Sequence, residues 1–200
     1  MYCLNLQVMH GIPDNLQDSA FQLYLNELKR HTSTLAISDE QLIKLLVLSL
    51  DWRFALAAVK DNHVVGLAGY QCKAGSFTGG ASPVQLLRCL GIRTFFRLNR
   101  SHLAASRKAQ PKELLHDGLI VSVDYRRQGV AMRLLNALRI HAEQANFTQM
   151  RLDVTEHNLP AIALYQKMGY QADHQKANGH WVYRRHLNSA VHWSEMSSEQ

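Results

Sequence analysis

The second half of the chain alternates between strand and helix periodicities, and this alternation limits the possible folds more than any other feature. Residues 114–123 form a mostly apolar run that is typical of a buried strand. Residues 130–145 repeat apolar side chains at helical spacing, and their expected inward face consists of Ala131, Leu134, Leu135, Leu138 and Ala142. The sequence therefore predicts a strand that turns into an amphipathic helix near residues 126–129.

The same alternation continues towards the C-terminus. Residues 150–155 alternate apolar and polar side chains as a half-buried strand does. Pro160 suits the first turn of a helix that ends at Gly169. Two further strands are expected at 170–174 and 181–187. This half of the chain thus has the predicted order βαβαββ.

The first half of the chain predicts a strand, two helices and a β-hairpin. Alternation at 4–8 indicates the strand, and helical spacing follows at 16–31. Ser38 and Gln41 form a capping-box pattern at the start of the second helix. Two apolar runs within 54–72, separated by a turn, indicate the hairpin. Strands and helices mixed in this way predict an α/β (α+β mixed) fold, in which helices cover a sheet.

Positive charge is concentrated in one segment. No Asp or Glu occurs between Asn62 and Lys112, whereas the whole chain has a net charge of +6. The cations of the segment are Lys73, Arg88, Arg93, Arg97, Arg100, Arg107, Lys108 and Lys112. Its apolar spacing predicts a basic helical insert at about 75–112. The insert is interpreted as a lid over a substrate site, as a solvated helix on one sheet edge, or as a surface for a membrane or an acidic partner.

Composition limits the size and setting of the protein. The 200 residues suffice for one domain, expected at 1–187, and the polar tail at 188–200 is expected to fray. No apolar stretch approaches the roughly 18 residues of a membrane span, and no signal-peptide pattern is visible. Three cysteines without CxxC spacing favour no disulfide framework, and the histidines lack metal-ligand spacing. We expect a cytoplasmic protein without a membrane span or a metal, as a monomer or homodimer.

The junction between strand and helix has the composition of a phosphate site. A helix N-terminus presents about four unpaired backbone N–H groups and roughly half a positive charge. Gly129 lets a ligand approach the backbone, and Ala131 keeps the next position small. Arg126, Arg127 and Gln128 add donors beside the amides. The junction therefore indicates a cradle for a diphosphate, with a merely structural helix cap as the alternative.

Two motifs resemble those of the GNAT N-acetyltransferase superfamily. Residues 121–131 resemble its acetyl-CoA motif, Gln/Arg-x-x-Gly-x-Gly/Ala after a strand, and Arg126, Gly129 and Ala131 match the three defining positions. Residues 158–170 resemble its downstream motif, Asn-x-x-Ala-x-x-Leu-Tyr-x-x-x-Gly-Phe/Tyr. The chain has neither a P-loop nor a GxGxxG motif.

This resemblance implies a fold and a mode of cofactor binding. The sheet is expected to be mostly antiparallel and splayed between its fourth and fifth strands, with helices on both faces and the insert between the third and fourth strands. The pantetheine arm of acetyl-CoA is expected to lie in the gap, where a backbone N–H, that of Val121 first of all, polarises the thioester carbonyl. The implied cofactor-binding residues are Ile120, Val121, Val123, Arg126, Arg127, Gln128, Gly129, Val130, Ala131 and Asn158. A cap at the start of a helix is the alternative role of Asn158.

The resemblance also implies candidates for proton transfer. Tyr165 matches the tyrosine that protonates the departing sulfur, and packing of its helix on the sheet is the alternative role. The attacking amine must lose a proton, because alkylamines with a pKa near 10 are charged at pH 7. Asp117 is the first candidate for the base, since it shares a strand face with Leu119 and Val121 unless a bulge reverses that order. His116 and Glu113 follow it.

Three functions are considered on these grounds. The first is an N-acetyltransferase that moves acetyl directly from acetyl-CoA to an amine of a small molecule or peptide. The second is a binding module in which the cradle holds acyl-CoA without catalysis. The third is a nucleic-acid-binding protein that uses the basic insert, which we do not favour because the insert lacks a recognition motif and spaced aromatic side chains.

Overall fold

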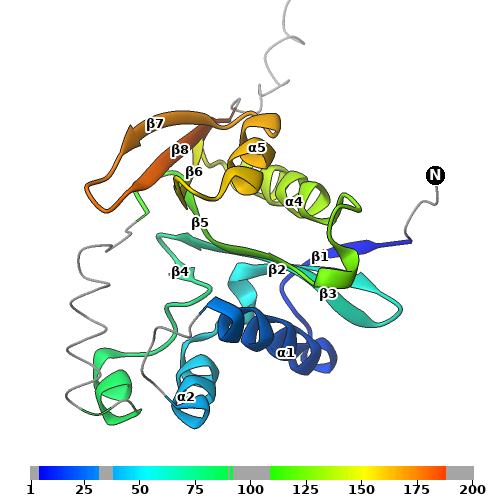
Figure 1. Ribbon diagram of the computed structural model, residues 1–200, viewed down its shortest axis with the longest axis vertical. Helices are drawn as coiled ribbons and strands as arrows, with labels where there is room; N and C mark the ends of the chain where they lie inside the picture. Colours follow the sequence, from blue (N-terminus) through cyan, green and yellow to red (C-terminus); the bar gives the residue numbers. More distant parts are fainter. Residues whose placement is uncertain (1–4, 32–37, 90, 92–108, 188–200) are drawn as a thin grey trace, which may run out of the picture.

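The strand and helix patterns of the sequence come together in one eight-stranded sheet with helices on both faces (Figure 1). The computed structural model describes residues 5–31, 38–89, 91 and 109–187. Within them the strand order is β1-β2-β3-β5-β6-β8-β7, and a short β4 pairs with β3. All neighbouring strands are antiparallel except β5 and β6. The expected mixed, mostly antiparallel fold is confirmed.

The first half of the chain supplies the first three strands and two helices on one face. These elements are β1 (Gln7–His10), α1 (Asp14–His31), α2 (Asp39–Ser49), η1 (Trp52–Phe54), β2 (Ala55–Lys60) and β3 (His63–Cys72). The capping box that begins α2 is present, with Ser38 and Gln41 bonded to each other's backbone N–H. The first strand begins later than predicted, at Gln7, and residues 1–4 lie outside the described part of the chain.

The insert is described only in part. It contains β4 (Gly75–Ser76) and helical residues at 83–89. Five of the eight cations of the positively charged segment, Arg93, Arg97, Arg100, Arg107 and Lys108, lie outside the described residues, as does the tail at 188–200. No helix in the described part of the chain is both long and apolar enough to cross a membrane.

The second half follows the predicted order closely. Its elements are β5 (Glu113–Val121), η2 (Val123–Tyr125), α4 (Val130–Gln144), β6 (Gln149–Thr155), α5 (Leu159–Lys167), β7 (Gln171–Gln175) and β8 (His180–His186). The inward face of α4 differs by one residue from the prediction, because Val130 is buried where Ala131 was expected. The helix α5 ends as predicted, with Gly169 at a positive φ of 82° just after it.

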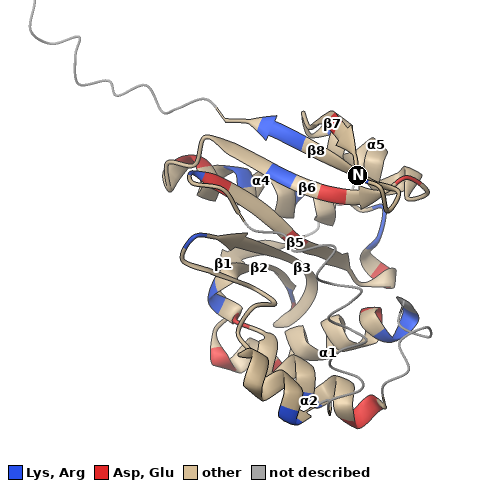
Figure 2. Cartoon of the chain, turned by 90° about the vertical axis from the view of Figure 1, so that its left-hand side faces the viewer, with Lys and Arg blue, Asp and Glu red and all other residues tan. Residues whose placement is uncertain are grey.

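The core has two layers, one on each face of the sheet. Side chains from α4 pack with one face of β2, β3, β5 and β6. Side chains from α1 and α2 pack against the other face of β2 and β3. Figure 2 shows β1, β2 and β3 nearly free of charged residues, whereas β6 and β8 contain several. The apolar first strands explain why helices cover this part of the sheet on both faces.

The sheet opens between β5 and β6. These parallel strands pair only at Glu113↔Gln149, Leu114↔Met150 and Leu115↔Arg151. Both then continue, β5 to Val121 and β6 to Thr155. Beyond Leu115 the two strands therefore diverge, which is the expected splay. We call this opening the V.

Candidate active site

A bulge in β5 determines which of its side chains point to the α4 face of the sheet and which to the α1 face. The pairing of β3 with β5 shifts between Ala68 and Tyr70, and Gly118 has a φ of +112°. Glycine tolerates this backbone conformation, which other residues rarely adopt. Beyond the bulge Leu119 and Val121 pack towards α4, and Ile120 packs towards α1.

The bulge corrects the predicted position of Asp117. His116 contacts Tyr170 on the α4 face and so shares that face with Leu119 and Val121. Asp117 points to the opposite face, where its charge acts on Tyr24 of α1. The expectation that Asp117 lies on the face of Leu119 and Val121 was therefore wrong, for the physical reason that a bulge reverses the alternation.

Backbone groups of β5 face the V at alternate residues. The N–H of Ser122 donates to the carbonyl of Val65, so Ser122 and Val65 form a hydrogen-bonded pair. In an antiparallel ladder the next residue directs its N–H and C=O away from the partner strand. Val121 and Leu119 therefore direct theirs towards the V, and Ile120 directs its own towards β3. The predicted backbone role of Val121 is compatible with this register, that of Ile120 is not, and Leu119 was missed.

The cradle at the start of α4 has the backbone geometry of an open anion site. Gly129 caps the helix with φ 82° and ψ 3°. Apart from its chain neighbours, a Cβ built at Gly129 would find no atom of the described residues within 4 Å. The first helical bond runs from the N–H of Arg133 to the carbonyl of Gly129, so the preceding amides lie before the helical ladder. Val130 anchors this turn, because its side chain is 2% exposed.

The polar side chains of the cradle bind to the protein itself. Arg126 donates from Nε to the carbonyl of Val121 at 3.1 Å and forms an ion pair with Glu27 of α1 at 2.9 Å. Gln128 donates to the carbonyl of Asp124 at 2.7 Å. Arg127 is exposed and has a positive φ of 62°.

Across the V, α5 carries the second motif. The side-chain oxygen of Asn158 accepts a hydrogen bond from the N–H of Ala161 at 3.3 Å, so this residue caps the helix. Tyr165 is half-buried, and its ring lies edge-on to His116 and Tyr170, with centroid distances of 6.3 and 5.9 Å. The structure thus brings Tyr165 and His116 together.

His116 is a buried, neutral imidazole. It is 4% exposed, and its Nε2 lies 2.6 Å from the hydroxyl of Tyr170. Its Nδ1 is buried without a hydrogen-bond partner among the described residues. Burial lowers the pKa of His116 to about 3. Because its protonated form is so strongly disfavoured, His116 is poorly suited to take a proton from an amine near pH 7.

Asp117 is hydrogen-bonded to β4 and to the residues just after it. Its Oδ2 accepts hydrogen bonds from the hydroxyl of Ser76 at 2.8 Å, the N–H of Thr78 at 2.9 Å and the hydroxyl of Thr78 at 2.7 Å. Periodicity and spacing do not indicate these partners. They fix the carboxylate on the α1 side of β5, next to the bulge.

Glu113 lies at the closed end of the V. It is 0% exposed, and its carboxylate is 3.3 Å from Arg151 and 3.6 Å from Arg184. It also accepts from the N–H of Gln110 at 2.9 Å. These contacts give Glu113 the geometry of a buried ion network that joins β5, β6 and β8, remote from the open part of the V.

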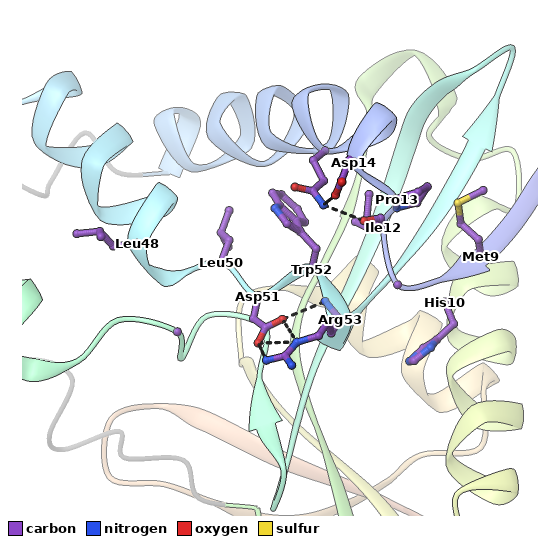
Figure 3. Close-up of a pocket in the computed structure, with 13 residues that line it drawn as sticks. Met9, His10, Ile12, Pro13, Asp14, Leu48, Leu50, Asp51, Trp52 and Arg53 are labelled. Carbon is purple, nitrogen blue, oxygen red and sulfur yellow. Dashed lines mark hydrogen bonds and ion pairs between the residues drawn. The ribbon is translucent and has the colours of Figure 1, made fainter.

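Exposed apolar side chains occur on the elements that follow β5 and β6 in the chain. Val123 of η2, Met132 of α4 and Leu159 of α5 are 47%, 36% and 68% exposed. A separate pocket of about 880 Å³ lies at the junction of β1, α1 and η1, lined by His10, Asp14 and Trp52 among others (Figure 3). None of the predicted site residues lines it, so its size does not make it the better candidate. The motifs and the backbone geometry point to the V.

The comparisons with known proteins agree with this geometry. The model of the Acetyltransferase (GNAT) family matches residues 18–170. No curated protein sequence matches the chain. Among solved structures, the ribosomal-protein-S18-alanine N-acetyltransferase of Escherichia coli is 14% identical, with a TM-score of 0.55, and the match covers 94% of this chain and 97% of that one.

Two further structures share the fold. The paia N-acetyltransferase of Thermoplasma acidophilum, in complex with coenzyme A, is 10% identical with a TM-score of 0.58, covering 92% of this chain and 99% of that one. A GCN5-related N-acetyltransferase of Kribbella flavida is 16% identical with a TM-score of 0.58, covering 91% and 98%. The family model spans most of the chain and the sheet has the same architecture. This chain belongs to the GNAT acetyltransferase family.

Proposed function

We propose that this protein transfers acetyl from acetyl-CoA directly to the amine of a small molecule or peptide. The geometry of the V is the main support for this proposal. Along one strand, Leu119 and Val121 direct their backbone groups away from β3, and the carbonyl of Val121 accepts a hydrogen bond from Arg126. The open cradle at Gly129 follows the same strand. An extended arm that ends in a diphosphate complements this arrangement, because the strand edge binds amides and the helix start binds phosphates.

The residues present are compatible with acetyl-CoA. The Gly129 position lets phosphate oxygens approach the amides at the start of α4, where a side chain would intrude. The exposed side chains of Val123, Met132 and Leu159 are proposed to provide apolar surface beside the arm. When bound, acetyl-CoA supplies an acyl thioester, which an amine attacks.

We assign the catalytic roles to one backbone group of β5 and to side chains on both sides of this strand. The N–H of Val121 is proposed to hydrogen-bond the thioester oxygen and stabilise the charge that develops there. Tyr165, at the α5 side, is proposed to deliver its proton to the departing sulfur. Asp117 is proposed to take the proton of the amine, because it lies beside the bulge on the opposite face and is held by Ser76 and Thr78. His116 supports Tyr165 by packing rather than by titrating.

The experiment that tests the function is a turnover assay with a panel of amines. The purified protein is incubated with acetyl-CoA and each amine, and the release of free thiol is followed. The panel includes a peptide with an N-terminal alanine, because the structurally similar enzyme from Escherichia coli is named as an acetyltransferase for an alanine of ribosomal protein S18. Thiol release that depends on the amine supports the proposal, and absence of CoA binding refutes it.

A non-catalytic acyl-CoA sensor is the second candidate. It is favoured by one observation, that Oδ2 of the proposed base Asp117 already accepts three hydrogen bonds. CoA binding without turnover across the whole panel supports the sensor, and amine-dependent thiol release excludes it.

A further inference from the structure

Arg126 lies between two places that attract its charge. Its guanidinium donates twice from Nη2 to the carboxylate of Glu27, at 2.9 and 3.0 Å, and once from Nε to the carbonyl of Val121. Glu27 belongs to α1, on the opposite side of β5 from α4. Arg126 itself precedes Gly129 by only three residues. The side chain that the motif places at the diphosphate cradle therefore pairs with an acidic residue from another element.

The surroundings of Glu27 make this pair separable. The side chain of Glu27 is 18% exposed and that of Arg126 is 46% exposed. Arg30, one helical turn further along α1, lies 3.5 Å from the same carboxylate. If Arg126 moves away, Glu27 keeps a cationic neighbour and is not left as an isolated charge.

The second contact of Arg126 is also at the ligand site. The carbonyl of Val121 faces the V, where the arm of the ligand is proposed to bind. The arm of a ligand bound in the V would therefore meet Arg126 at the Val121 carbonyl, and its diphosphate would lie at the cradle three residues further along the chain. A guanidinium binds phosphate with the same paired geometry that it uses for carboxylate.

We propose that Glu27 sets the affinity of this site for CoA by competing with the diphosphate for Arg126. This inference rests on the proposed function for the identity of the ligand. In the free protein Arg126 pairs with Glu27, and on binding it transfers to the diphosphate while Arg30 remains beside Glu27. The exchange breaks one ion pair to form another, so CoA binds more weakly and leaves more readily than it would without Glu27.

The test compares CoA binding by the wild type and two matched variants. Glu27→Gln releases Arg126 while keeping the size of the side chain. Glu40→Gln is the control, because Glu40 also forms an ion pair on a helix, with Lys44, and its loss changes the net charge by the same amount. By isothermal titration calorimetry we expect Glu27→Gln to bind CoA about three- to tenfold more tightly than the wild type, and Glu40→Gln to match the wild type.

A second arm identifies Arg126 as the residue released. Arg126→Gln is expected to weaken CoA binding, and adding Glu27→Gln to it is expected to change nothing further. Pantetheine, which lacks the diphosphate, is expected to respond equally weakly to Glu27→Gln and Glu40→Gln. A gain that persists in the Arg126→Gln background overturns the proposal.

The remaining outcomes are also decisive. If Glu27→Gln binds CoA as the wild type does or more weakly, Glu27 only holds Arg126 in place and the proposal fails. If Glu27→Gln does not fold, Glu27→Asp, which shortens the reach by one methylene, serves with the same expected sign. If the wild type binds no CoA at all, the proposed function fails instead, so the two failures are distinguishable.

Discussion

The substitution Gly129→Ala separates the structural and ligand-binding roles of the cradle. Gly129 has a φ of +82°, and a Cβ there would meet none of the described residues within 4 Å other than its chain neighbours. The substitution therefore adds only the backbone strain of an alanine in the left-handed conformation. This strain lowers the free energy of unfolding by about 1 to 2 kcal/mol. For a chain of this size that lowers Tm by about 2 to 4 °C per kcal/mol.

The cost to CoA binding is expected to be larger than this strain. A Cβ at Gly129 lies where phosphate oxygens are proposed to approach the amides of α4, and one lost hydrogen bond to a charged group costs about 1.5 to 3 kcal/mol. Such a loss weakens binding by about ten- to a hundredfold. Gly11→Ala provides the matched control, because Gly11 has a φ of +71° and equally open surroundings but lies in the loop between β1 and α1.

The assay combines thermal unfolding with calorimetric titration of CoA for the wild type and both variants. Both alanine variants should lose similar stability, and only Gly129→Ala should lose affinity. Equal CoA affinity in the two variants would show that no phosphate approaches the backbone at Gly129, and the assignment of the cradle would be refuted.

Three further variants test the proposed proton transfers and the buried histidine. Tyr165→Phe should lower kcat by about a hundredfold with the Kd of acetyl-CoA nearly unchanged. If kcat and the affinity for acetyl-CoA fell by the same factor, the hydroxyl would have a binding role instead. Asp117→Asn should lower kcat/KM at pH 7 with a loss that shrinks as the pH approaches about 10, the pKa of a free alkylamine, whereas a loss constant with pH would argue against a base. Burial lowers the pKa of His116 to about 3, so the unfolded state takes up the proton first and wild-type stability falls as the pH decreases from 7 towards 3. Urea unfolding at pH 7 and pH 5 should show roughly 2 kcal/mol of this loss at most, and a His116→Gln variant that loses as much stability would contradict it.

Much of the fold could be predicted from the sequence because its signals are local and repeated. The helix α4 follows from four apolar side chains at helical spacing, and the capping box of Ser38 and Gln41 marks the start of α2 within four residues. The two motifs lie in the predicted strand-to-helix and helix-to-strand junctions. Each of these features depends on neighbours in the chain, so periodicity and spacing suffice to find it.

The side-chain arrangement of the site depended on features that periodicity does not encode. One glycine, Gly118, carries the bulge that moves Asp117 to the α1 face. An isolated glycine within a strand pattern is a signal for a bulge, so Gly118 was the one feature of the sequence that could have predicted it. The partner of Arg126, Glu27, is 99 positions away, and such a pair follows only from the folded arrangement of α1 and β5.

The V also divides the sheet according to the order in which the chain is synthesised. The strands on one side, β1, β2, β3 and β5, all precede residue 122, and those on the other, β6, β7 and β8, all follow residue 148. The helix between them, α4, packs mainly on the first group. On the ribosome, the first half-sheet and its covering helix can therefore assemble before β6 emerges. The V, where the ligand is proposed to bind, then lies between a half-sheet that can form early and one that forms later, and three parallel residue pairs join the two.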